Sequence, residues 1–268
     1  MSVSAAIYVF SVITIKIKKE HCVSWDFYQC LVNDKPASIY LNLGLASSAP
    51  LARYPELFYL RIPMRQPRAD GLSSQEEFDA LLQLEDTVVA ALSAENSMLY
   101  VGRLTSDGCR DLFFYSINDD IDEAVLENSL SAFADYAWEG GLNPDPDWET
   151  FFQLLMPSDE QLERIKNRRI CDTLADQGEA FSTPREIMHW AYFATEPVAL
   201  LYAGKVQEAG YQVQDVQQQD DENERYGVRV SNVGIPSHQQ IDEYTLPLFR
   251  AAAELGGRYD GWESSVIV

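Results

Sequence analysis

The stretch Leu248-Phe-Arg-Ala-Ala-Ala-Glu-Leu-Gly-Gly-Arg-Tyr-Asp-Gly-Trp262 decides how the end of this chain is expected to fold. Its apolar residues recur at helical spacing up to Leu255, and Gly256-Gly257 then supplies a stop signal. Tyr259-Asp260-Gly261-Trp262 leads directly into a short apolar strand, predicted over 259–266. A helix followed at once by a closing strand is typical of an α+β domain.

The residues before this stretch predict further strands and helices of the second half. Alternating polarity with aromatic residues indicates a strand before residue 194, and an acidic tip separates two strands of a later hairpin. The predicted elements are a charged helix over 159–176, a strand over 185–193, a helix from an N-cap at Thr195 to Gly210, strands over 211–217 and 225–233, and a helix that begins at the capping box Ser237-x-x-Gln240 and contains Pro247.

The sequence of the first half predicts a similar order of strands and helices, with an additional hairpin at its start. The predicted elements are strands over 25–32, 37–43 and 57–64, a helix from the capping box Ser74-x-x-Glu77 to Asn96, a hairpin over 98–105 and 109–117 around Asp107-Gly108, a helix over 122–133 and a strand over 136–139. The prolines of residues 143–148 and 156–158 are expected to deny regular structure at the junction of the two halves. We therefore predict two α+β domains, 1–157 and 158–268, each a ferredoxin-like β-α-β-β-α-β sandwich with an antiparallel sheet.

Charge and composition indicate which partners and compartments suit the chain. Its net charge of −22 repels a phosphate backbone, so we expect no direct nucleic-acid binding and a basic protein partner, such as one with an Arg-rich segment. The cysteines at 22, 30, 109 and 171 form no C-x-x-C pair and fit a reducing cytoplasm. The apolar segment Ala5–Ile17 is predicted to be an edge strand or a poorly ordered extension. It lacks a basic n-region and is too short to span a bilayer, so neither a signal peptide nor a membrane contact is expected.

No constellation of catalytic or metal-binding residues stands out. The histidines at 21, 189 and 238 are too few and too scattered to form a metal site with the cysteines. Nucleophile-elbow, Walker and dinucleotide-binding motifs are absent. His189 is expected to be a structural histidine within a strand. Cys109, beside Arg110, is either an ordinary strand cysteine or a thiol of lowered pKa. The sequence thus predicts no enzyme, no cofactor and no metal.

The second half resembles the regulator of ribonuclease E activity B (RraB) family over about Ile170 to Ile267. The points of likeness are Leu174-x-x-x-Gly178, Tyr192-Phe193, Ala209-Gly-Tyr-Gln-Val213 and, most specifically, Glu254-Leu-Gly-Gly-Arg-Tyr-Asp-Gly-Trp262. The resemblance implies a protein inhibitor that docks on the scaffold region of ribonuclease E and alters RNA turnover without cutting RNA. Pro247 and the long first half depart from the family pattern and leave the identity of the target open.

The first half resembles the domain-of-unknown-function family numbered 695 over about Val23 to Pro157. The matching stretches are Trp25-x-Phe-Tyr28, Gly71-Leu72, Glu76-Glu77, Val101-Gly-Arg-Leu-Thr105, Gly108-x-Arg110-x-x-x-Phe114-Tyr115 and Asp145-Pro-x-Trp148. That family carries no established activity. The resemblance therefore indicates the family of this domain but implies no function for it.

Two segments of the second half are candidate partner-binding sites. The first is the acidic hairpin tip Asp220, Asp221, Glu222 and Glu224, which is either a solvated turn or a site that captures an Arg-rich peptide. The second comprises Tyr259, Asp260 and Trp262. Their run is either structural, with the two rings covering the end of the sheet, or an interface with an exposed aromatic anchor.

Three functions remain open from the sequence. The leading hypothesis is a non-enzymatic, protein-binding regulator, an inhibitor of ribonuclease E activity. The second is a sensor that binds a small molecule in a cleft between two ferredoxin-like domains. The third is an enzyme that uses Asp or Glu side chains of the first half.

Overall fold

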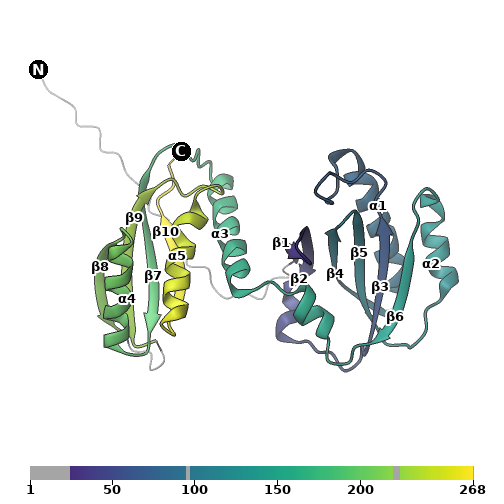
Figure 1. Cartoon of the computed structure of the whole chain (residues 1–268), viewed down its shortest axis with the longest axis horizontal. Coiled ribbons are helices and arrows are strands. Elements are labelled where there is room, and N and C mark those ends of the chain that lie inside the picture. Colours follow the sequence, from purple (N-terminus) through teal and green to yellow (C-terminus); the bar gives the residue numbers. More distant parts are fainter. Residues whose placement is uncertain (1–24, 95–96, 220–223, 268) are drawn as a thin grey trace, which may run out of the picture. The chain divides into compact units, whose positions relative to one another are not determined.

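The computed structural model describes residues 25–94, 97–219 and 224–267. These residues form two compact units, the first ending at Ser158 and the second beginning at Asp159 (Figure 1). Each unit is an α+β structure built on its own antiparallel sheet. The predicted strand over Ala5–Ile17 lies outside the described residues.

The first unit is built on a six-stranded sheet in the order β1-β2-β4-β5-β3-β6. Its elements are β1 (Trp25–Val32), β2 (Lys35–Asn42), β3 (Glu56–Pro63), α1 (Gln75–Leu92), β4 (Met98–Ser106), β5 (Cys109–Ser116), α2 (Glu123–Leu130) and β6 (Glu139–Pro144), with short helices over Leu43–Ser47, Ser131–Phe133 and Thr150–Leu155. Asn33-Asp34 and Asp107-Gly108 join β1 to β2 and β4 to β5, and all four residues have positive φ. Such two-residue turns suit the twist of a hairpin, so these local signals fix both pairings.

Apolar side chains cover both faces of the first sheet. On one face, Leu84 and Val88 of α1 pack in one cluster with Leu60 of β3 and Phe114 of β5. Successive residues of a strand point to opposite faces, so Tyr115 points away from that cluster. Its ring stacks on Trp148, with centroids 3.9 Å apart.

The prediction that residues 143–148 and 156–158 lack regular structure is wrong only at Asn143 and Pro144, which belong to β6. Between these two segments, Thr150–Leu155 forms a short π-helix that was not predicted, and its residues Phe151 and Leu155 are fully buried, as is Trp148. Prolines flank this helix without entering it, and the burial of Trp148 and Phe151 stabilises the segment.

The last strand of the first unit was also predicted at the wrong place. It was expected over 136–139, whereas β6 runs from Glu139 to Pro144 and pairs with β3. The two glycines 140 and 141 weaken the strand signal in the sequence. In the structure they leave room for neighbouring rings, because a Cβ on Gly141 would lie 2.8 Å from the ring of Tyr59.

The second unit has a four-stranded sheet in the order β10-β7-β9-β8. Its elements are α3 (Asp159–Asp176), β7 (Arg185–Phe193), α4 (Glu196–Glu208), β8 (Gln212–Gln218), β9 (Tyr226–Gly234), α5 (Ile241–Glu254) and β10 (Arg258–Ser264) (Figure 1). Without its leading hairpin, the first sheet has the order β4-β5-β3-β6, which repeats the connectivity of β8-β9-β7-β10. In both units a central strand leads through a helix to a hairpin, and a second helix leads to a closing strand.

Helices cover one face of the second sheet. Tyr202 of α4 and Leu248 of α5 pack in one cluster with Ala191 of β7 and Val228 of β9. The predicted position of Pro247 inside the last helix is confirmed. Helix α3 packs beside α5 and therefore belongs to the second unit.

Neither predicted capping box forms. Ser74 precedes α1 without capping it through its side chain, and the Glu77 carboxylate accepts instead from the backbone N–H groups of Arg65 and Gln66, each at 2.7 Å. Helix α5 begins at Ile241, and Ser237 lies in the turn before it. Contacts with a distant loop thus replace the reciprocal local bonds that define a capping box.

We expect a fragment that begins at Ser158 to fold on its own. Its core clusters draw their side chains from α3 through β10. A 111-residue fragment buries a smaller share of its surface than the full chain, so its unfolding free energy is expected to be modest. Urea unfolding followed by circular dichroism should give one cooperative transition. A non-cooperative loss of signal would show that the two units share a core.

Candidate functional site: the open face of the second sheet

The two faces of β7 have different surroundings. Residues Ile187, His189, Ala191 and Phe193 are all buried, whereas the residues between them are partly or fully exposed. Ala191 and Phe193 pack under α4 and α5, and Ile187 packs with residues of α3. All three helices therefore lie on this inner face. We call the opposite side the open face.

His189 is a fully buried, fully bonded side chain on the inner face. Its Nδ1 lies 2.8 Å from the hydroxyl of Tyr259, and its Nε2 lies 2.7 Å from Oδ1 of Asn232. Burial lowers the pKa of His189 to about 4. The prediction of a structural histidine is confirmed.

Stability of the second unit is expected to fall in mild acid because of His189. In the unfolded chain this imidazole binds a proton near pH 6.5, but in the folded protein it does so only near pH 4. The unfolded state binds more protons between these values, so the free energy of unfolding falls as the pH drops from 6.5 towards 4, by about 3 kcal/mol in total. Urea unfolding of His189→Gln should lack this part of the pH dependence. An NMR titration showing a His189 pKa near 6.5 would contradict the prediction.

A β-bulge in β10 turns both aromatic residues of its closing motif inward. The register with β7 shifts between Tyr259 and Gly261, and Gly261 has a φ of +132°. Tyr259 and Trp262 are three residues apart and would face opposite ways in a regular strand, yet they are only 4% and 7% exposed. This burial supports the structural interpretation of both rings and leaves little ring surface for a partner.

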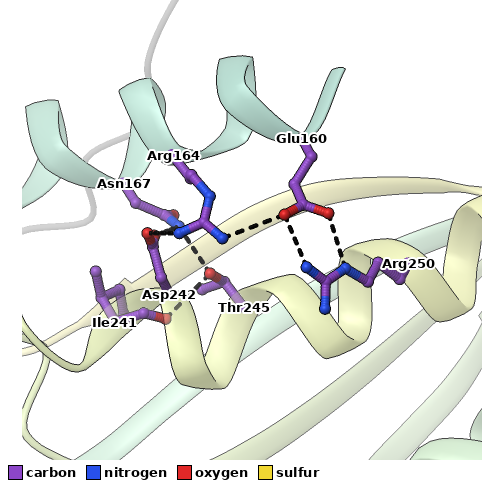
Figure 2. Close-up of polar contacts among 7 residues, drawn as sticks. All are labelled: Glu160, Arg164, Asn167, Ile241, Asp242, Thr245 and Arg250. Carbon is purple, nitrogen blue, oxygen red and sulfur yellow. Dashed lines mark hydrogen bonds and ion pairs between the residues drawn. The ribbon is translucent and has the colours of Figure 1, made fainter. Parts of the chain in front are cut away.

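Asn167 of α3 holds Trp262 in this buried position. The Nε1–H of Trp262 donates to Oδ1 of Asn167 at 2.9 Å. The side-chain amide of Asn167 donates in turn to Asp242 at 2.8 Å and to Thr245 at 2.7 Å, both on α5 (Figure 2). One amide thereby joins α3, α5 and β10. The sequence analysis missed this residue, since an asparagine in a charged helix gives no signal of burial.

Ion pairs continue the contact between α3 and α5 (Figure 2). Arg250 forms two hydrogen bonds with Glu160, at 2.7 and 2.8 Å, and Arg164 pairs with Asp242 at 2.7 Å. The hydrogen bonds from Arg250 lower the pKa of Glu160 to about 2. These exposed pairs orient α3 more than they stabilise it.

The open face presents aromatic rings among charged groups. Trp190 and Tyr192 of β7 are partly exposed there. Arg258 of β10 lies over the Tyr192 ring, 5.2 Å from its centroid, and forms ion pairs with Glu224 and Asp260. The hydrogen bond with Glu224 raises the pKa of the Arg258 guanidinium.

Carboxylates outnumber cationic groups on the open face. Among the described residues of the strands, the alternation of side chains places the carboxylates of Glu186, Asp215 and Glu263 on this face, together with the guanidinium groups of Arg229 and Arg258. Glu224 and Asp260 join them through their ion pairs with Arg258. Both arginines are already paired with carboxylates of this face. The net charge of the face is therefore negative, which suits a cationic partner.

The structure separates the candidate binding residues into three groups. Glu224 and Asp260 lie together on the open face, joined through Arg258. Tyr259 and Trp262 lie on the inner face. Asp220, Asp221 and Glu222 lie outside the described residues. Trp190 and Tyr192 were not predicted to be surface residues, although their alternation with His189 and Ala191 indicated that they face away from the core.

The motif residues of the first unit have structural roles. Asp145 accepts a hydrogen bond from the Tyr115 hydroxyl at 2.7 Å, and from the backbone N–H groups of Glu149 and Thr150 at 2.7 and 3.0 Å. Trp148 stacks on Tyr115 and donates to the carbonyl oxygen of Tyr54 at 3.0 Å. The motif thus fastens the π-helix segment to the sheet.

The buried acidic groups of the first unit are engaged in pairs. Glu85 accepts from Arg103 at 2.6 Å, from Arg110 at 3.2 Å and from the Tyr100 hydroxyl at 2.8 Å. Burial lowers the pKa of Arg110 to about 10. Glu85 therefore serves as the counter-ion of two arginines.

Burial raises the pKa of the Cys109 thiol, so the alternative of a thiol with lowered pKa is wrong.

An open pocket of about 290 Å³ beside the β9–α5 connection, lined by Phe181 and His238 among others, lies at the lower limit for ligand sites. Within the described ranges no group of three His, Cys, Asp or Glu side chains could hold a metal ion. No helix in that part of the chain is both long and apolar enough to cross a membrane.

Comparisons with known proteins give two family matches. The model described as "Family of unknown function (DUF695)" matches residues 23–156, and that described as "Regulator of ribonuclease activity B" (RraB) matches residues 164–264. No curated protein matches the chain. A solved structure titled "Crystal Structure of an Unknown Protein from Galdieria sulphuraria" has 11% sequence identity and a TM-score of 0.22, with 80% of this chain and 99% of that chain covered. So low a score supports no inference about the fold.

Both matches coincide with the halves in which the sequence resemblances were found. The first match spans half of the chain and contains the hairpin turns, the Tyr115–Trp148 stack and the Asp145 contacts. The second spans the open face and the closing motif. The protein therefore belongs to the family of unknown function DUF695, and its second half matches the RraB family.

Proposed function

We propose that this protein regulates a ribonuclease by binding to it, without catalysis of its own, and that the second unit makes the contact. The RraB match over residues 164–264 carries this proposal, because that family is described as a regulator of ribonuclease activity. The resemblance of Glu254–Trp262 to the end of RraB makes ribonuclease E the proposed target, with docking on its scaffold region and a lower rate of RNA turnover as the result.

The open face is the proposed contact surface. It carries Glu224 and Asp260 beside exposed aromatic rings, and its charge is negative. Asp220, Asp221 and Glu222 adjoin Glu224 in sequence and are proposed to add to this charge. A basic segment of the partner would gain charge complementarity here, whereas a nucleic-acid backbone would be repelled.

We also propose that the protein acts in the cytoplasm and that both units are ferredoxin-like domains. The shared strand connectivity of the two sheets supports the assignment of the fold. The DUF695 unit is proposed to be a separate module joined at Ser158–Asp159, because the core clusters of each unit are made of its own residues.

The proposed function is tested with the full chain and purified ribonuclease E. We expect a complex in size-exclusion chromatography, slower cleavage of a model RNA when the chain is added, and no cleavage by the chain alone. A ribonuclease E that lacks its scaffold region is the control and should be neither bound nor inhibited. Absence of a complex at low salt would overturn the proposal.

Affinity for the partner should fall steeply with added salt. Screening shortens the Debye length from about 10 Å at 0.1 M to about 3 Å at 1 M, which weakens attraction between exposed charges. The net charge of −22 motivates the expectation. Fluorescence anisotropy of labelled partner over this range measures it. A dissociation constant that stays constant with salt would remove electrostatic capture as the mode of binding.

A further inference from the structure

The two aromatic rings on the open face have different neighbours on β10. In the register of β7 with β10, Tyr192 stands opposite Arg258, and Trp190 stands opposite Gly261. On β10, one ring is therefore next to a guanidinium group and the other is next to a residue without a side chain. On β9 the order is reversed, with Gly227 opposite Tyr192 and Arg229 opposite Trp190. The comparison that follows concerns the β10 side.

The Tyr192 position shows how this face holds a guanidinium group. Arg258 lies over the ring and donates to Oε2 of Glu224 at 2.7 Å and to Asp260. Ring and carboxylates act together on the cation, and a planar guanidinium suits both kinds of contact. The side chain of Arg258 is nevertheless about half exposed, so this arrangement forms at the surface.

On its β10 side, the Trp190 position has a ring and carboxylates but no arginine. A Cβ placed on Gly261 would meet no atom within 4 Å, so the space beside the ring is open. Asp260 is exposed on one side of Gly261. Trp262 points inward, so Glu263 points to the open face. An aromatic ring and two carboxylates thus lie beside a place on the β10 side that Gly261 leaves open. Asp260 also pairs with Arg258, and Arg229, which stands opposite Trp190 on β9, is paired with Asp215.

We propose that this place binds an arginine side chain of the protein partner, whose guanidinium stacks on Trp190 above Gly261 and pairs with Asp260 and Glu263. The inference rests on the proposed function and names the chemistry of its contact. The excess of carboxylates on the face favours a cationic segment. Lysine would fit less well, since its compact ammonium neither stacks nor bonds in a planar fork.

The test uses the full chain and two labelled peptides, one alternating arginine with glycine and one alternating lysine with glycine. Fluorescence anisotropy should show tighter binding of the arginine peptide. Trp190→Ala should weaken that binding about tenfold, since a cation–π contact of this kind contributes about 1–2 kcal/mol. Trp138→Ala is the matched control, because Trp138 is a 39%-exposed tryptophan of the first unit. It should bind as the unchanged protein does.

A second variant, Glu263→Gln, tests the place without removing an aromatic ring. It should weaken the arginine peptide more than the lysine peptide, because a carboxylate accepts a bidentate guanidinium. Equal affinity for the two peptides, or unchanged binding by Trp190→Ala with a native circular-dichroism spectrum, would overturn the proposal. So would Trp190-dependent binding of a single-stranded RNA oligonucleotide, because stacked bases would then be the occupant.

The outcomes also separate this inference from the proposed function. If the full chain inhibits ribonuclease E and the Trp190→Ala variant inhibits it equally well, the proposed arginine-binding site at Trp190 is wrong and the proposed function stands. If the arginine peptide binds through Trp190 but ribonuclease E forms no complex with the chain, the proposed function is wrong and the proposed arginine-binding site stands.

Discussion

Trp148→Ala is expected to lower the unfolding free energy of the first unit by about 3–5 kcal/mol, the usual cost of removing a buried tryptophan. The ring is fully buried and stacks on Tyr115 with an interplanar angle of 7°. Its loss leaves a cavity and also leaves the carbonyl oxygen of Tyr54 without the indole donor. Urea unfolding of a fragment ending at Ser158 measures the change.

Trp138→Ala is the control for this experiment. Trp138 is 39% exposed, so its removal should change the unfolding free energy far less. If both variants lose the same small amount, the segment after β6 is not part of the core. The assignment of the Asp145-Pro-x-Trp148 motif to the buried core would then be wrong.

Trp262→Ala is expected to cost the second unit about 3–5 kcal/mol for the same reason. The indole is 7% exposed, packs with Ile187 and Ile241, and donates to Asn167. Removing it leaves Oδ1 of Asn167, a buried acceptor, without its donor. Because Asn167 also bonds to α5, we expect the docking of α3 to loosen.

Trp190→Ala is the matched comparison, since Trp190 lies on the open face of the same sheet. It should lower the unfolding free energy much less than Trp262→Ala does, because the Trp190 ring is already partly exposed, and it should reduce partner binding. Thermal and urea unfolding of both variants, with binding measured in parallel, decide the matter. A stable Trp262→Ala variant that fails to bind would show that this ring contacts the partner.

Much of the α+β architecture was predictable because its signals are local. The bounds of β1 and β7 were predicted to the residue, β7 from its alternating polarity and β1 with the turn signal at Asn33-Asp34 after it. The hairpin turn at Asp107-Gly108 was also predicted, since its positive φ values suit those residue types. The capping box at Ser74 failed because the loop near Arg65 competes for the Glu77 carboxylate.

The sequence by itself determined the order of strands and helices and the net charge, because short-range periodicity and composition determine them. Its motifs carried the family resemblances. Only the tertiary structure decided which way the aromatic residues of β10 face. The bulge at Gly261 adds one residue to β10, and one residue is enough to move a side chain to the other face of a sheet. Tyr259 and Trp262 therefore became core residues, while Trp190 and Tyr192 remained at the surface. The place beside Trp190 depends on pairing between β7 and β10, some seventy residues apart in the chain, and no local pattern encodes that register.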